Sequence, residues 1–161
     1  MECTMKKLIL MLLFVFITQV AFAGGFAKVG GDATNRIVFN NKLITLGYQH
    51  KFFYLFDYQL EAGNFSNHGK SLPDESYFVG SSVGVSLVQH SWYAKSFIGP
   101  ALVTPTNVYL NTPIELNTDL ELGLRDHRGL GMGVGYKHMS NGGVTTPNLG
   151  RDFLFLKIQL P

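Results

Sequence analysis

Apolar residues occupy every second position along most of this chain, and this alternation constrains the fold more than any other feature. Side chains alternate faces along a β-strand, so each such stretch predicts a strand with one apolar and one polar face. In the clearest stretch, Ile114, Leu116, Leu120, Leu122 and Leu124 oppose Glu115, Asn117, Asp119 and Glu121. We predict strands over residues 25–31, 42–51, 54–64, 75–88, 92–104, 112–125, 128–140 and 151–160.

Two all-β architectures fit this pattern: an exported soluble sandwich, and a barrel that turns its apolar face to lipid. The lengths of the connections favour the barrel. Short connections near residues 52–53, 89–91 and 126–127 alternate with long ones at 32–41, 65–74, 105–111 and 141–150. Short turns at one end and long loops at the other are typical of membrane barrels. The predicted fold is therefore an all-β, eight-stranded antiparallel transmembrane β-barrel of the outer membrane.

The polar faces of these strands are predicted to fill the barrel interior. The expected inward acids are Asp57, Glu61, Glu115, Asp119 and Glu121, which would face Lys28, Lys137 and Lys157. An eight-stranded barrel is just wide enough to be filled by side chains, so we expect no pore. Several aromatic residues lie near predicted strand ends, as an aromatic girdle requires. They are Tyr48, Phe53, Phe56, Tyr58, Trp92, Tyr93, Tyr109 and Tyr136.

The first residues read as an export signal. Lys6 and Lys7 precede an apolar run over residues 8–20, and Ala21-Phe22-Ala23 is a small-x-small cleavage site. We expect residues 1–23 to be a signal peptide and residues 24–161 to form one barrel domain. Beyond the signal, no stretch approaches the ~20 apolar residues of a membrane-spanning helix, which excludes a helical membrane protein. The formal net charge of +2 gives no argument for a nucleic-acid partner.

Three polar residues with complementary chemistry lie at the edge of an apolar face. His138 and Ser140 share the parity of Leu130, Met132, Val134 and Tyr136, and Asp152 lies at the start of the next strand. Polar side chains on a lipid-facing parity cost free energy, so their presence favours a functional role. A serine, a histidine and an acid can supply a nucleophile, its base and an orienting group, without a metal or cofactor. The pattern predicts a hydrolase with an apolar substrate.

This hairpin resembles the lipid A 3-O-deacylase (PagL) family of outer-membrane enzymes. That family carries an H-x-S-N motif, then a P-N-x-G turn and an acidic residue. Here the matching segments are His138-Met139-Ser140-Asn141, Pro147-Asn148-Leu149-Gly150 and Asp152. The resemblance implies that Ser140 is the nucleophile, His138 its general base and Asp152 the orienting acid. It also implies that Asn148 supports the oxyanion hole, while Asn141 is expected to brace the turn.

The acid position departs from the family, which usually carries Glu there. Because Asp is one methylene shorter, either the hairpin closes more tightly in this chain or His138 is held less firmly. The two basic residues beside the motif, Lys137 and Arg151, are candidates for contacts with lipid A phosphates, or for ordinary anchors at the membrane interface.

The resemblance implies that the substrate is lipopolysaccharide in the outer leaflet. The reaction would release the ester-linked 3-hydroxyacyl chain from the 3-position of lipid A as a free fatty acid. Two alternatives stay open: a phospholipase or esterase with the same triad, and a non-enzymatic small barrel. A homodimer also stays open, because a lipid-facing stripe and a dimer interface look alike in sequence.

Overall fold

The computed structural model of this chain describes residues 24–33, 42–66, 75–107, 109–146 and 149–161. The expected signal peptide, residues 1–23, lies outside the described residues. Within those ranges there is no helix of the length and apolar character needed to cross a membrane.

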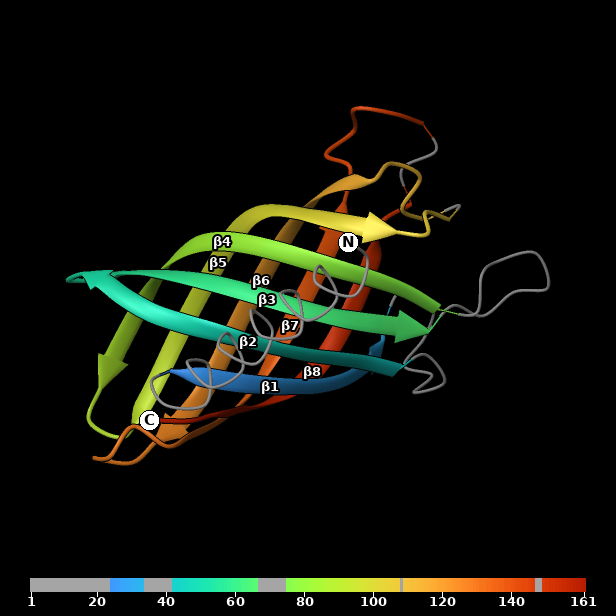
Figure 1. Cartoon of the computed structure of the whole chain (residues 1–161). Coiled ribbons are helices and arrows are strands. Elements are labelled where there is room, and N and C mark those ends of the chain that lie inside the picture. The colour runs from blue at the N-terminus through green and yellow to red at the C-terminus, as the bar shows by residue number, and fades with distance from the viewer. Residues whose placement is uncertain (1–23, 34–41, 67–74, 108, 147–148) are drawn as a thin grey trace, which may run out of the picture.

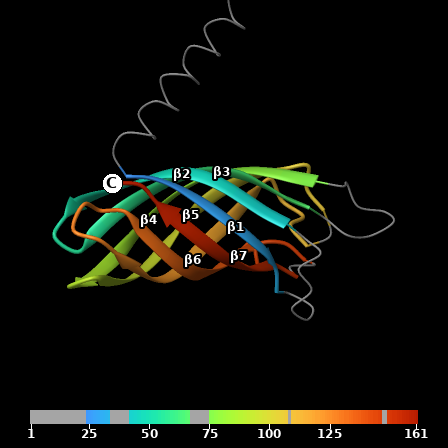
Figure 2. The same cartoon turned by 90° about the horizontal axis from the view of Figure 1, so that it is seen from below.

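Eight strands close into one antiparallel barrel in which each strand pairs with its neighbours in sequence and β1 pairs with β8 (Figures 1 and 2). The strands are β1 (Gly25–Asp32), β2 (Lys42–Phe53), β3 (Phe56–Ser66), β4 (Glu75–Gln89), β5 (Trp92–Thr104), β6 (Ile114–Arg125), β7 (Gly131–Ser140) and β8 (Arg151–Gln159). The predicted all-β barrel is therefore confirmed, and the short turns lie at the end opposite the described parts of the β5–β6 and β7–β8 connections (Figure 1).

Strand ends differ from the prediction where turn chemistry overrides the alternation. Residues 52–53, predicted as a turn, belong to β2, and the chain turns at Tyr54, whose φ of 27° is outside the strand region. The predicted strand over 128–140 begins only at Gly131. Before it, the Asp126 carboxylate accepts hydrogen bonds of 2.9 Å from the backbone amides of both Arg128 and Leu130, which closes a turn.

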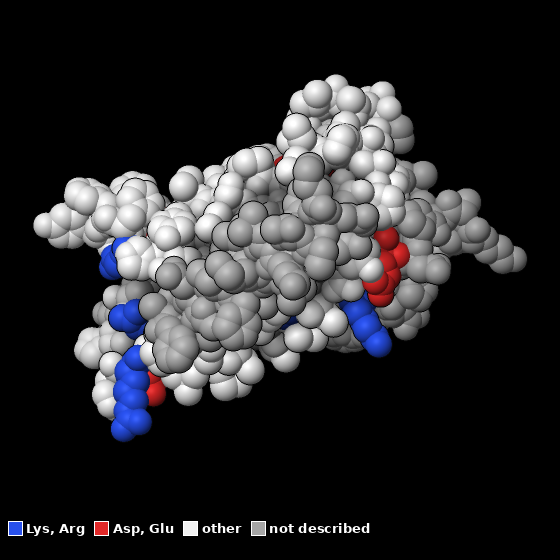
Figure 3. All heavy atoms as spheres, in the orientation of Figure 1, with Lys and Arg blue, Asp and Glu red and all other residues white. Residues whose placement is uncertain are grey.

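The apolar and polar faces of the strands point outward and inward as predicted. In β6, Leu120 is 50% exposed whereas the neighbouring Asp119 is fully buried. The same outward exposure holds for large aliphatic side chains of the other strands, including Leu46, Val79, Ile98, Val134 and Leu156. In Figure 3 the charged side chains of the visible described surface lie mainly toward the two ends of the barrel. This surface is suited to contact with lipid.

Three lysines and three acids form an ion-pair network inside the barrel: Lys28, Lys137, Lys157, Glu61, Asp119 and Glu121. Lys28 Nζ lies 3.1 Å from Glu121 Oε1, and Lys137 Nζ lies 2.8 Å from Asp119 Oδ1. Buried charges are tolerated only when they are paired, which this network achieves. Asp57 and Glu115 are also inside, but the hydrogen bonds they accept come from neutral groups.

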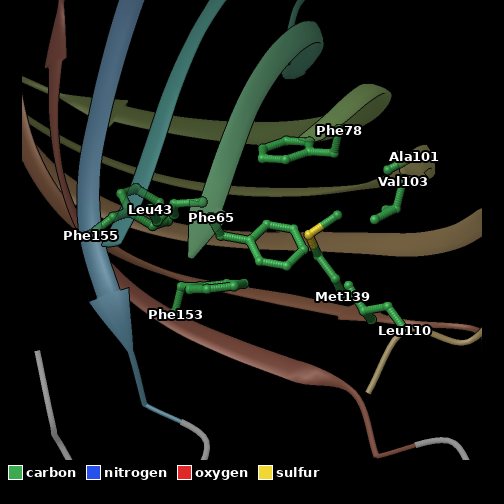
Figure 4. Close-up of a cluster of buried hydrophobic side chains, with 9 residues drawn as sticks. All are labelled: Leu43, Phe65, Phe78, Ala101, Val103, Leu110, Met139, Phe153 and Phe155. Carbon is green, nitrogen blue, oxygen red and sulfur yellow. The ribbon is translucent and has the colours of Figure 1, made fainter. Parts of the chain in front are cut away.

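An apolar cluster fills the interior near the loop end of the barrel, and we call it the mouth cluster (Figure 4). Its members are Leu43, Phe65, Phe78, Ala101, Val103, Leu110, Met139, Phe153 and Phe155. All but Leu110 come from strands. Leu110 comes from the β5–β6 connection and is fully buried, so this connection folds over the end of the barrel instead of extending away from it.

Two aromatic residues expected in the girdle lie elsewhere. Tyr93 is only 1% exposed because its side chain points inward, where the ring lies 4.6 Å from Lys95 Nζ. Tyr109 packs against the mouth cluster. The prediction is wrong for these two positions, while Phe53, Phe56 and Trp92 are exposed near strand ends.

Candidate active site

His138 and Asp152 face each other across the β7–β8 pair. They are direct partners in the strand register, and their side chains meet on the outer surface. His138 Nδ1 lies 2.7 Å from Asp152 Oδ1, with the two side chains 38% and 28% exposed. The alternation along β7 and β8 brings this contact about, because direct cross-strand partners project from the same face.

Buried neighbours anchor these two polar side chains. Met139 and Phe153, which follow His138 and Asp152 in the sequence, are both fully buried in the mouth cluster (Figure 4). Because consecutive residues of a strand point to opposite faces, burial of these two side chains fixes His138 and Asp152 on the outside.

Ser140 is the last residue of β7 and shares the outward parity of His138. It is 8% exposed, and within the described part of the chain no hydrogen bond joins its Oγ to the His138 ring. The backbone of Gly150 lies next to both His138 and Ser140. A Cβ placed on Gly150 would lie 3.0 Å from His138 Cε1 and 3.6 Å from Ser140 Cβ. Gly150 therefore lies against both His138 and Ser140, and the absence of a side chain there leaves room for the His138 ring.

The structure adds Tyr136 to this group. Its hydroxyl donates a short hydrogen bond to Asp152 Oδ1, the oxygen that also contacts His138 Nδ1. The sequence placed Tyr136 on the correct face but indicated only a girdle residue. Its position two residues before His138 was the available signal, because residues i and i+2 of a strand lie on one face.

Asn141 makes several hydrogen bonds within and beside the loop that follows β7. Its side-chain amide donates to Asn111 Oδ1 at 2.8 Å and to Thr145 Oγ1 at 2.7 Å, and its Oδ1 accepts from the Gly143 amide at 2.9 Å. Thr145 Oγ1 also donates to Asn111 Oδ1 at 2.9 Å. The β5–β6 connection thus holds the loop next to the candidate site. Asn148 lies outside the described residues.

The two basic residues expected near lipid A phosphates point into the barrel. Lys137 is fully buried, with Nζ 2.5 Å from Glu61 Oε1. Arg151 is 2% exposed, pairs with Asp32, and has its guanidinium carbon 4.4 Å from the centre of the Tyr109 ring. Both have the inward parity of their strands, so this expectation does not fit the structure. Over the described ranges, no group of three His, Cys, Asp or Glu side chains is placed to hold a metal ion.

The fold and the site define a class: a small eight-stranded barrel with an apolar outer face and a serine, histidine and acid at its loop end. Within that class, the chain belongs to the lipid A 3-O-deacylase (PagL) family, whose sequence model matches residues 38–161. This match spans most of the barrel, including β7 and β8.

The fold is that of a solved outer-membrane enzyme. The crystal structure of the outer membrane enzyme PagL superposes with a TM-score of 0.66 at 18% identity, covering 86% of this chain and 99% of that chain. The outer membrane protein Ail of Yersinia pestis, determined in a phospholipid bilayer nanodisc, has a TM-score of 0.48 at 11% identity, with the same coverage of each chain. No curated protein matches this sequence.

Proposed function

We propose that this chain is an outer-membrane serine esterase that removes the ester-linked 3-hydroxyacyl chain from the 3-position of lipid A. The observation that carries this proposal is the 2.7 Å contact between His138 Nδ1 and Asp152 Oδ1, on the strand face that also carries Ser140. Membership of the lipid A 3-O-deacylase family supports the same reaction.

In this proposal, the role of each of the three side chains follows from the group that it faces. Asp152 binds the Nδ1 side of the His138 ring and so keeps the proton there, which leaves Nε2 as the base. Nε2 takes the hydroxyl proton of Ser140 as the Ser140 Oγ attacks the ester carbonyl. The tetrahedral intermediate collapses to an acyl-serine, and the protonated His138 gives its proton to the departing sugar oxygen. Water, deprotonated by His138, then releases the fatty acid and regenerates Ser140.

The position of the site supports a lipid substrate. His138 and Asp152 are partly exposed on a barrel surface that is largely apolar, next to the long-loop end. In outer-membrane barrels the long loops lie on the extracellular side. We propose that the site lies at the level of the outer leaflet, where an acyl ester of lipopolysaccharide is within reach. This location also requires export, which we assign to residues 1–23 as a signal peptide.

The test uses purified, folded protein in detergent, incubated separately with lipid A and with a glycerophospholipid. We expect release of a free 3-hydroxy fatty acid from lipid A, little release from the phospholipid, and no release by Ser140→Ala or His138→Ala. Faster hydrolysis of the phospholipid would make the chain a phospholipase. Release that survives Ser140→Ala would contradict the covalent mechanism, and no release from either lipid would favour a non-enzymatic barrel.

A further inference from the structure

We propose that Tyr136 is a positioning residue for the catalytic acid, holding the Asp152 carboxylate in the orientation that His138 needs. This inference rests on the proposed serine esterase function and adds a fourth side chain to its site. Tyr136 touches neither Ser140 nor the reacting ester in this account, and it acts only through Asp152.

The geometry that points to this role is the sharing of one oxygen. Asp152 Oδ1 accepts a hydrogen bond from the Tyr136 hydroxyl and also lies 2.7 Å from His138 Nδ1. The terminal torsion of an aspartate carboxylate is broad and has no sharp preferred angle, so the carboxylate is free to turn unless its partners hold it. A second donor from another direction removes this freedom and keeps Oδ1 aimed at the imidazole.

Tyr136 has an aliphatic register partner on each neighbouring strand. Tyr136 pairs with Leu120 of β6 on one side and with Leu154 of β8 on the other, and both leucines are outward-facing. Asp152 lies two residues before Leu154 on the same face of β8, so the tyrosine reaches it diagonally across the strand pair. Tyr136 thus lies between two aliphatic residues on the outer face, while its hydroxyl binds the carboxylate.

The short acid explains why such support is useful. Aspartate has one methylene fewer than glutamate, so the carboxylate works close to the backbone of β8, and only a narrow range of its terminal torsion aims Oδ1 at the imidazole. The Tyr136 hydroxyl stabilises the ionised carboxylate in that position, and hydrogen bonds to charged groups are stronger than neutral ones. We infer that Tyr136 and Asp152 together do what a longer acid would do alone.

The first experiment measures fatty acid release by Tyr136→Phe, which removes the hydroxyl and keeps the ring. We expect kcat to fall about tenfold, the size of effect that loss of one charge-assisted hydrogen bond can produce, while KM stays within about twofold. An unchanged kcat would overturn the proposal, and so would a loss confined to KM, because that would make Tyr136 a lipid contact.

The second experiment asks whether the hydroxyl acts through the carboxylate. In an Asp152→Ala background, Tyr136→Phe should cause no further loss of kcat. In an Asp152→Glu background, the longer acid should reach His138 unaided, so Tyr136→Phe should cost less than about twofold. A full tenfold loss in the Ala background would overturn the proposal even if Asp152→Glu is itself inactive.

A matched control is available at Tyr77 in β4. Its hydroxyl also donates to a carboxylate two residues away, Glu75 Oε2 at 2.9 Å, on the exposed surface near the loop end. Tyr77→Phe should leave kcat unchanged. If the parent chain releases hydroxy fatty acid and Ser140→Ala does not, then an inert Tyr136→Phe refutes only this inference. If the parent chain itself is inactive, the proposed function fails first.

Discussion

At the residue scale, the alternation of the sequence predicted which candidate side chains share a face. His138 and Asp152 do meet on the outer surface, and the Nδ1 to Oδ1 distance of 2.7 Å shows that an aspartate is long enough there. The hydroxyl of Tyr136 was not predictable in the same way, because a tyrosine on a lipid-facing parity is also what a girdle requires. The alternation also predicted Lys137 inside the barrel, where it lies, and Arg151 shares this inward parity, so neither side chain is on the outer surface where a lipid A phosphate would be met.

The role of Asp152 can be tested by removing its charge without changing its size. Asp152→Asn should lose most activity, because the amide can stabilise the imidazole tautomer that carries its proton on the wrong nitrogen. Asp152→Glu should remain active. The measurement is the rate of free hydroxy fatty acid release from lipid A. Near-native turnover by Asp152→Asn would show that His138 and Ser140 work as a dyad.

At the element scale, the site depends on how the β7–β8 hairpin and the loops beside it fit together. Met139 and Phe153 in the mouth cluster anchor the strands from inside, and the backbone amide of Gly150 donates to the Tyr109 carbonyl at 3.2 Å. Strand positions came from the period-2 pattern to within a few residues. The pattern did not predict that the β5–β6 connection folds over the end of the barrel, because loop packing depends on contacts between segments distant in sequence.

Gly150 offers a test of this fit. Its φ of +65° is unfavourable for other residues, and a Cβ there would lie 3.0 Å from His138 Cε1. We expect Gly150→Ala to reduce kcat at least tenfold by displacing the His138 ring. Gly142→Ala is the matched control, since its φ is +64° but its added Cβ would meet nothing within 4 Å. Equal losses in both variants would attribute the effect to backbone strain alone.

At the scale of the whole molecule, an apolar outer face surrounds a charged interior. The sequence predicted both faces and the closed eight-stranded fold, because alternation and loop lengths are properties of the entire chain. It did not predict which charges would pair. Lys28 and Lys137 both reach Asp119, whereas Asp57 and Glu115 accept hydrogen bonds from neutral groups. Such pairing depends on the stagger of the strands around the barrel.

Cysteine labelling tests the orientation of the barrel wall. Leu120 is 50% exposed and Asp119 fully buried, so Leu120→Cys should react with a lipid-phase reagent in membranes while Asp119→Cys is protected. Comparing the two labelling yields in folded protein gives the answer. The reverse pattern would contradict the assignment of inner and outer faces.

The interior network makes a separate prediction about stability. Asp119→Ala would leave Lys28 and Lys137 with fewer compensating charges in a fully buried setting. Breaking a buried ion pair typically costs ~3–5 kcal/mol, and we expect a loss of that order in the free energy of unfolding. Urea titration of the folded barrel in detergent measures it, with the exposed Glu75→Ala as the control. A urea midpoint equal to that of the parent chain would show that the network adds little to the stability of the barrel.

The central claim is that Ser140 deacylates lipid A in the membrane, and mass spectrometry of lipid A from cells that express this chain tests it most directly. The account predicts that lipid A loses one ester-linked 3-hydroxyacyl chain, at the 3-position, in cells with the parent chain. Lipid A should stay intact in cells with an equally abundant, folded Ser140→Ala variant. Intact lipid A in both kinds of cells, or loss of the same acyl chain in both, would contradict the claim that Ser140 deacylates lipid A.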